Sequence, residues 1–171
     1  WDAISAQGDA TQATSLNTDA FGTLDNLGLE RVAFLRGEEV TGFRTRSSKL
    51  GDIVYSSPLY VGSPRGRHPG ESYGDFIIAN RDRDPIIYVG ANDGMLHGFD
   101  LDTGEERVAY VPGPVYPNLS HLTDPDYGNE NLPHRYFVDG SPMSADIEFG
   151  DDWMTVLLGG LNAGGQGYYA L

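Results

Sequence analysis

The stretch DPIIYVGANDGMLHGFDLDTGEERVAYVP, residues 84–112, decides the fold because three short strand-like runs follow one another with turn residues between them. Residues 86–89 are β-branched or aromatic, and the Asp93-Gly94 pair after them supplies the positive φ of a tight hairpin. Residues 95–101 alternate, with one face made of Met95, His97 and Phe99 and the other of Leu96, Gly98 and Asp100. Residues 102–104 form the next turn and residues 107–111 the third run. The stretch predicts a β-meander on which more sheet must stack.

The same order of motifs returns near the end of the chain. Residues 138–142, VDGSP, echo residues 55–58, YSSP, and residues 155–160, TVLLGG, echo residues 86–91, IIYVGA. Residues 168–171 then stand where residues 96–99 stand in the first copy. Repeated groups of short antiparallel strands are typical of β-propeller blades of about four strands each. The sequence therefore predicts a mainly β protein containing a partial propeller of about two blades.

The chain divides into a lead-in, residues 1–50, and an incomplete propeller segment, residues 51–171. Residues 1–20 are polar and predict weak structure, residues 24–35 predict one short helix that Gly37 ends, and residues 42–49 form a basic connector. Blade one covers about 52–111, with a strand at 53–61 interrupted by Ser-Pro, a loop at 63–74 and a short strand at 76–79. Blade two covers about 136–171. Because a propeller closes with about four to eight blades, we expect the chain to be a segment of a longer protein.

Residues 112–134 form a long insertion between the two predicted blades. Ordered loops of this length are more often functional than average connections, so the insertion is expected to project as a contact surface. The alternative is an Ω-loop packed on its own side chains, Val115, Tyr116, Leu119 and Leu122.

Composition limits the partners and the chemistry. The 171 residues include 25 acidic and 11 basic ones, and the formal charge of −14 argues against nucleic acid as the main partner. Basic residues gather in one region, which is either a strip for a partner or a set of ordinary solvated loops: Arg31, Arg36, Arg44, Arg46, Lys49, Arg65 and Arg67, against Glu38, Glu39 and Asp52. There is no cysteine, so disulfides and thiolate chemistry are not available. No apolar run is long enough to span a bilayer, and the residues after Trp1 do not form a signal peptide.

No pattern predicts catalytic, cofactor-binding or metal-binding residues, so we expect a protein that is not an enzyme. No Gly-x-Ser-x-Gly elbow occurs, and the four histidines lack paired metal-ligand spacing and are interpreted as surface or packing residues: His68, His97, His121 and His134. Asp100 and Asp102 are weak candidates for a calcium loop, because alternate carboxylates can converge on a hard cation. A third ligand and a distant bidentate Glu are missing, so turn chemistry explains both residues.

The strings YVGANDGMLHGFD at 88–100, DTGEE at 102–106 and AYVP at 109–112 resemble the PilC/PilY family of type IV pilus biogenesis factors and tip adhesins. Other pieces match the family in the same order: VAFLRGE at 32–38, RSSKLGDIV at 46–54, SSP at 56–58, LTDP at 122–125, HRYFVDGSP at 134–142 and LGGL at 158–161. The resemblance extends over roughly residues 31–171, and the ordered series of motifs makes it more specific than any single motif.

The resemblance implies a non-enzymatic component of type IV pilus assembly, twitching motility and surface adhesion. The implied partners are minor pilins or a pilus-tip complex, together with a host or abiotic surface, and the implied location is extracellular, at the pilus tip or outer cell surface after export through the periplasm. Calcium is implied only elsewhere in a full-length protein, because the family's Asp-x-Asp-x-Asp-Gly pattern does not occur in this chain.

Two other functions stay open from the sequence. Residues 98–105, GFDLDTGE, also resemble the blade repeat of quinoprotein dehydrogenases, so the segment could belong to a quinoprotein-like redox propeller, which would show quinone absorbance. A secreted propeller that binds glycans would instead show saturable carbohydrate binding without a pilus phenotype.

Overall fold

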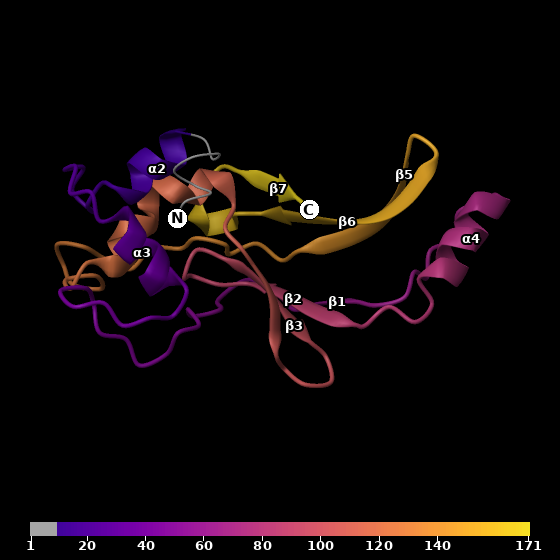
Figure 1. Ribbon diagram of the computed structural model, residues 1–171, viewed down its shortest axis with the longest axis horizontal. Coiled ribbons are helices and arrows are strands. Elements are labelled where there is room, and N and C mark those ends of the chain that lie inside the picture. Colours follow the sequence, from indigo (N-terminus) through magenta and orange to yellow (C-terminus); the bar gives the residue numbers. More distant parts are fainter. Residues whose placement is uncertain (1–9) are drawn as a thin grey trace.

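The computed structural model describes residues 10–171 as two antiparallel sheets with short helices at both ends of an elongated molecule (Figure 1). In chain order the elements are α2 (Ala10–Leu16), α3 (Gly28–Leu35), β1 (Leu59–Val61), α4 (Glu71–Ala79), β2 (Ile86–Gly90), β3 (Leu96–Asp100), β4 (Glu106–Tyr110), the 3-10 helix η1 (Gly113–Thr123), β5 (Met143–Phe149), β6 (Asp152–Gly160), the 3-10 helix η2 (Asn162–Gly164) and β7 (Tyr168–Ala170). The weak structure predicted for residues 1–20 is wrong where α2 forms, and its first part, residues 1–9, lies outside the described residues.

The first sheet contains the predicted meander. Its strand order is β1-β2-β3-β4, with every neighbouring pair antiparallel. The two turns form at the predicted glycines, where Gly94 has a φ of 95° and Gly104 a φ of 72°. The strand predicted at 53–61 shrinks to β1, because Pro58 has no N–H for a ladder and the serines before it bond to the second sheet.

The second sheet repeats this design with fewer strands. Its order is β5-β6-β7, so three strands are present where four were predicted. The long β5–β6 hairpin pairs Met143 with Leu158 at one end and Phe149 with Asp152 at the other. The repeat seen in the sequence is structural, since residues 155–159 lie in β6 just as the matching residues 86–90 form β2.

The segment that leads into the second sheet packs main chain to main chain against β2 and against β6, at glycines where no Cβ fits. A Cβ on Gly90 would lie 2.2 Å from the carbonyl oxygen of Val138, and a Cβ on Gly140 would lie 2.1 Å from the carbonyl oxygen of Gly160. The Val138 N–H also donates to the Ala91 carbonyl at 3.4 Å. These glycines are therefore required by close approach of main chain to main chain.

The two echoing Ser-Pro motifs lie beside each other and join the sheets. Ser56 Oγ donates to the Gly140 carbonyl at 3.2 Å and accepts from the Gly90 N–H at 2.9 Å. The Ser57 N–H donates to Ser141 Oγ at 2.9 Å. The repeat thus places each Ser-Pro motif where its polar groups satisfy those of the other copy.

Residues 76–79 belong to α4, so the strand predicted there is wrong, as is the loop predicted for its first residues. A four-residue apolar run is ambiguous between strand and helix, and packing decides it here. Tyr73 on α4 is 2% exposed, its ring centroid lies 4.6 Å from that of Trp153, and its hydroxyl donates to Asp146 at 2.6 Å. The helix, inserted between β1 and β2, is therefore anchored on the hairpin of the second sheet, at the far end of the molecule (Figure 1).

The insertion at 112–134 is part of the core. Its helix η1 buries Val115 at 2%, Leu119 at 0% and Leu122 at 3% exposure, and these side chains pack with Leu96 and Phe137. The prediction that this segment projects as a contact surface is wrong for these side chains. The apolar spacing here is that of a helix covering the ends of both sheets, and α2 and α3 pack against it (Figure 1).

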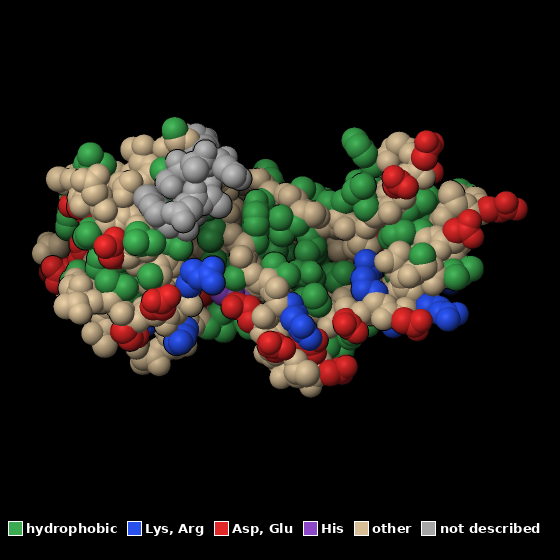
Figure 2. Space-filling model, in the orientation of Figure 1, with side chains coloured by type: hydrophobic (Ala, Val, Ile, Leu, Met, Phe, Trp, Pro, Cys, Tyr) green, Lys and Arg blue, Asp and Glu red, His purple; other side chains and the backbone are tan. Residues whose placement is uncertain are grey.

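Figure 2 shows hydrophobic side chains collected over the middle of one face of the molecule, with most charged side chains toward its lower edge and its far end. None of the helices between residues 10 and 171 is both long enough and apolar enough to cross a membrane.

Candidate functional site

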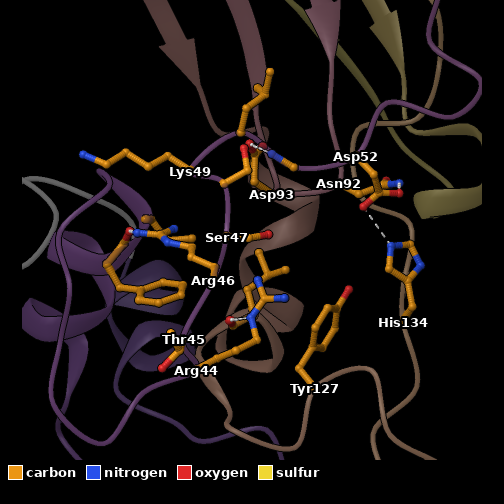
Figure 3. Close-up of a pocket in the computed structure, with 16 residues that line it drawn as sticks. Arg44, Thr45, Arg46, Ser47, Lys49, Asp52, Asn92, Asp93, Tyr127 and His134 are labelled. Atoms are coloured by element: carbon orange, nitrogen blue, oxygen red, sulfur yellow. Dashed lines mark hydrogen bonds and ion pairs between the residues drawn. The ribbon is translucent and has the colours of Figure 1, made fainter.

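A polar hollow of about 280 Å³ lies where the basic connector passes the first hairpin (Figure 3). Backbone contacts fix the connector there: the Arg44 N–H donates to the Thr123 carbonyl at 2.9 Å, and the Asn92 N–H donates to the Asp52 carbonyl at 3.0 Å. The hollow is thus walled by residues 44–52, the Asn92-Asp93 turn and the segment after η1, which brings Tyr127 and His134.

Two arginines of the connector lie over aromatic rings in this hollow. The Arg44 Cζ is 4.8 Å from the Tyr127 ring centroid and its Nε donates to the Leu122 carbonyl at 3.1 Å. The Arg46 Cζ is 3.8 Å from the Phe34 ring centroid and its Nη2 donates to the Phe34 carbonyl at 2.6 Å. Burial lowers the pKa of Arg46, which reflects a cation held away from water. Stacking on the rings restricts both guanidinium groups to fixed planes.

The two carboxylates in the wall use all their oxygens inside the protein. Asp52 accepts from His134 Nε2 at 3.0 Å and from Asn92 Nδ2 at 2.9 Å. Asp93 accepts from the Gly51 N–H at 2.7 Å and bonds to His97 through both oxygens at 3.0 Å. For Asp52, burial opposes ionisation, but the hydrogen bonds from Asn92 and His134 lower its pKa overall. These acids therefore serve to hold the wall together.

His97, next to the hollow, lies between two carboxylates. It is 4% exposed, with Nε2 3.0 Å from Asp93 and Nδ1 2.6 Å from Glu106 Oε1. Burial lowers the pKa of His97, but the hydrogen bonds and charges of Asp93 and Glu106 raise it more, so the net pKa lies above its ordinary value. Two ring nitrogens that face two carboxylates both donate only in the imidazolium form.

The other predicted residues lie apart from this cluster. His68 contacts the rings of Tyr73 and Trp153 near α4, while His121 is buried on η1 with a pKa lowered first by burial and then by the charge of Arg135. His134 is half-exposed and reaches the hollow. The interpretation of the histidines as surface or packing residues is incomplete for His97 and His134, which hold charged contacts.

The weak calcium candidates do not form a metal site. Asp100 caps its own turn, since Oδ1 accepts from the N–H groups of Asp102 and Thr103, and Oδ2 accepts from Arg107 Nη2 at 3.1 Å. Within residues 10–171 no group of three or more His, Asp or Glu side chains is arranged to hold a metal ion. Asp100 therefore serves its own turn, as turn chemistry predicts for it.

Sequence reasoning found the basic connector but not the hollow. Arg44 and Arg46 belong to the basic region noted from composition, whereas Tyr127 and His134 come from much later in the chain. The contact of Glu106 with His97 follows from the β3–β4 hairpin, where Phe99 pairs with Glu106. The expected register of that hairpin was the signal in the sequence that could have predicted the contact between Glu106 and His97.

A family model described as the PilY1 beta-propeller domain matches residues 50–171. The type IV pilus biogenesis factor PilY1 of Pseudomonas aeruginosa is 44% identical over 182 aligned residues, covering 100% of this chain and 15% of the relative. A PilY1 homolog of Xylella fastidiosa is 42% identical, covering 86% of this chain and 13% of the relative. The crystal structure of the Pseudomonas aeruginosa PilY1 C-terminal domain aligns with 65% of this chain and 21% of that chain, at 40% identity and a TM-score of 0.46.

The chain spans about 15% of the length of the curated relative from Pseudomonas aeruginosa. The family match covers both described sheets, including the hairpin of residues 84–112 and the repeated Ser-Pro motifs. Because this match extends over most of the chain and the identity over all of it, the chain belongs to the PilY1 β-propeller family.

Proposed function

We propose that this chain works in type IV pilus biogenesis as a non-enzymatic propeller segment that also contributes to surface attachment at the pilus tip. The observation that carries the proposal is the 44% identity to a protein named as a type IV pilus biogenesis factor, over the whole of this chain. Minor pilins or a tip complex would be its partners inside the pilus, and a host or abiotic surface its partner outside. Such a role places the protein outside the cell, after export through the periplasm.

The interior of the segment supports a scaffold role. The first sheet is joined to the segment that leads into the second by close main-chain packing at Gly90 and by hydrogen bonds of the Ser56 and Ser141 hydroxyl groups. Packed sheets with satisfied polar groups between them form a rigid body. A rigid body can hold exposed loops at fixed positions for a partner.

The second sheet supports the proposal that the segment belongs to a larger propeller. By register, Met143, Ile147, Phe149, Leu158 and Tyr168 share one face of this sheet, and their exposed fractions are 61%, 40%, 73%, 41% and 90%. A propeller blade buries both faces against neighbouring blades. A further blade of the same polypeptide would cover these side chains. Any calcium site would then lie in such a further part.

The test is an in-frame deletion of residues 50–171 from the gene in its parent organism, complemented with the intact gene. We expect fewer surface pili, measured as sheared pilin, together with reduced twitching and adhesion. The number of attached cells is also normalised to the amount of surface pilin, so that a loss of attachment can be told apart from a loss of pilus assembly. Normal piliation, twitching and adhesion in the deletion strain would rule out the proposed function.

A further inference from the structure

Three basic side chains that line the hollow form no ion pair in the part of the chain that the structure describes. The ion pairs formed among residues 10–171 involve as basic partners Arg31, Arg81, Arg107, His97 and His134. Arg44, Arg46 and Lys49 line the hollow and take part in none of them. This is unexpected in a chain with 25 acidic and 11 basic residues, where acids outnumber bases.

The unpaired donors are on two positioned guanidinium groups. Arg44 uses only Nε for a protein acceptor, which leaves both Nη groups free of any partner among residues 10–171. Arg46 uses Nη2 for two carbonyls, while its buried Nε has no partner. In Figure 3 the Arg44 guanidinium and the Tyr127 hydroxyl point into the same space, beside Ser47. Lys49 extends away from that space.

The acids of the wall form no ion pair with these cations, although the nearby charges of Glu39 and Asp93 partly offset the lowering of the Arg46 pKa by burial. Asp52 and Asp93 direct their oxygens to His134, Asn92, Gly51 and His97, as described above. A buried or half-buried cation without a counterion costs free energy. The hollow is therefore chemically complementary to an anion that enters from outside.

The rest of the wall favours a peptide over a small inorganic anion. Leu35 is partly exposed and gives one side of the hollow an apolar surface, which suits the methylene stem of a glutamate, while Phe34 and Leu122 lie buried behind it at 1% and 3% exposure. Residues 45–50 form no backbone hydrogen bond with the rest of the described chain, either as donors or as acceptors. A peptide main chain can use both kinds of group, whereas phosphate uses donors only.

We propose that this hollow binds the carboxylate of an acidic peptide segment of a partner protein, with Arg44 as the main bidentate ligand and Arg46 beside it. The planar fork of an arginine matches the two oxygens of a carboxylate. A volume of about 280 Å³ accommodates one acidic side chain at a time. This proposal rests on the proposed function only for the place where the protein would meet its partner. The binding itself is measured in solution.

The test uses calorimetric titration of the purified full-length protein with three probes: a hexaglutamate peptide, a hexaglutamine peptide and inorganic phosphate. We expect hexaglutamate to bind, to bind more weakly as salt is raised, and to bind at least about tenfold more tightly than the other two probes. Arg44→Gln should weaken hexaglutamate binding at least about tenfold. Arg81→Gln is the matched control, because Arg81 is an exposed arginine outside the hollow, and it should change binding less than about twofold.

Thermal unfolding of each variant shows whether it is folded. If Arg44→Gln does not fold, Arg44→Lys replaces it, since lysine keeps the charge but cannot form the bidentate pair, and it should still bind hexaglutamate several-fold more weakly. Absence of hexaglutamate binding to the wild type, or equal binding by the folded Arg44 variant, overturns the proposal. Phosphate binding as tight as hexaglutamate binding overturns the peptide assignment. Each of these results is independent of the piliation assay.

Discussion

At the residue scale, His97 links the stability of the fold to pH. Its folded pKa is raised, so the stability it contributes is fully present below the unfolded pKa of about 6.5 and is lost as pH rises through the folded pKa. We expect His97→Gln to lower the free energy of unfolding by about 2 kcal/mol at pH 5.5, and the deficit to shrink toward pH 9. Urea unfolding of both proteins across this range measures the difference.

His121 provides the contrast, because its pKa moves the other way. Burial is the main cause, so its contribution to stability is present above pH about 6.5 and is lost as pH falls through the lowered folded pKa. The stability deficit of His121→Gln should therefore grow as pH rises. Parallel pH profiles for the two variants would contradict the charge states given to both histidines.

Asn92, in the first hairpin, links the segment just after the basic connector to the segment that leads into the second sheet. Its Nδ2 donates to Asp52 at 2.9 Å and its Oδ1 accepts from the buried Phe137 N–H at 3.0 Å. Asn92→Ala should cost about 2–3 kcal/mol of unfolding free energy, because it leaves the Phe137 N–H without an acceptor. Asn129→Ala, which removes an exposed contact to Asp126 at 3.2 Å, should cost less than about 0.5 kcal/mol in the same urea experiment. Equal losses of unfolding free energy in the two variants would contradict the linking role of the Asn92 side chain.

Local chemistry made some residues predictable and left others hidden. Gly94 and Gly104 were placed correctly because a turn of positive φ depends on a few neighbouring residues. Arg44 and Arg46 were noted as part of a basic region, but their ring partners were not. The Arg44–Tyr127 stack joins residues far apart in the sequence, so it depends on tertiary packing that periodicity does not encode.

At the element scale, α4 shows how tertiary contacts decide an ambiguous segment. The run of residues 76–79 fits a strand or a helix equally well from its sequence alone. The helix forms where Tyr73 and Phe76 pack with Trp153, a residue of the second sheet. By contrast, residues 86–110 are predictable as strands because alternation, β-branching and turn residues all agree.

The anchor of α4 combines an aromatic cluster with two hydrogen bonds, from the Tyr73 hydroxyl to Asp146 and from Trp153 Nε1 to Ser72 Oγ. Tyr73→Phe removes the hydroxyl that donates to Asp146 at 2.6 Å and should cost about 1–2 kcal/mol of local stability. We expect faster amide hydrogen exchange in α4 and little change in β2 and β3. Tyr168→Phe, at a side chain that is 90% exposed, is the control and should leave exchange unchanged. Unchanged exchange in α4 of Tyr73→Phe would contradict the anchoring role.

At the scale of the whole molecule, the two sheets depend on the absence of a side chain at Gly90. Gly90→Ala places a Cβ 2.2 Å from the Val138 carbonyl oxygen, so β2 and the segment that leads into the second sheet must move apart. We expect a loss of about 3 kcal/mol in unfolding free energy, measured by urea denaturation. Gly113→Ala, where no atom lies within 4 Å of the added Cβ, should change stability by less than about 0.5 kcal/mol. A similarly small loss of unfolding free energy in both variants would contradict the close main-chain contact at Gly90.

The position of α4 also affects how the protein resists mechanical tension. The helix belongs by sequence to the first sheet, between β1 and β2, yet it is fastened to the hairpin of the second sheet through Tyr73 and Trp153. A force that pulls the blades apart must therefore break this fastening together with the Ser-Pro contacts, instead of peeling one strand at a time. Bonds loaded in parallel share the force, so separating the two sheets takes a larger force than breaking the same bonds one after another.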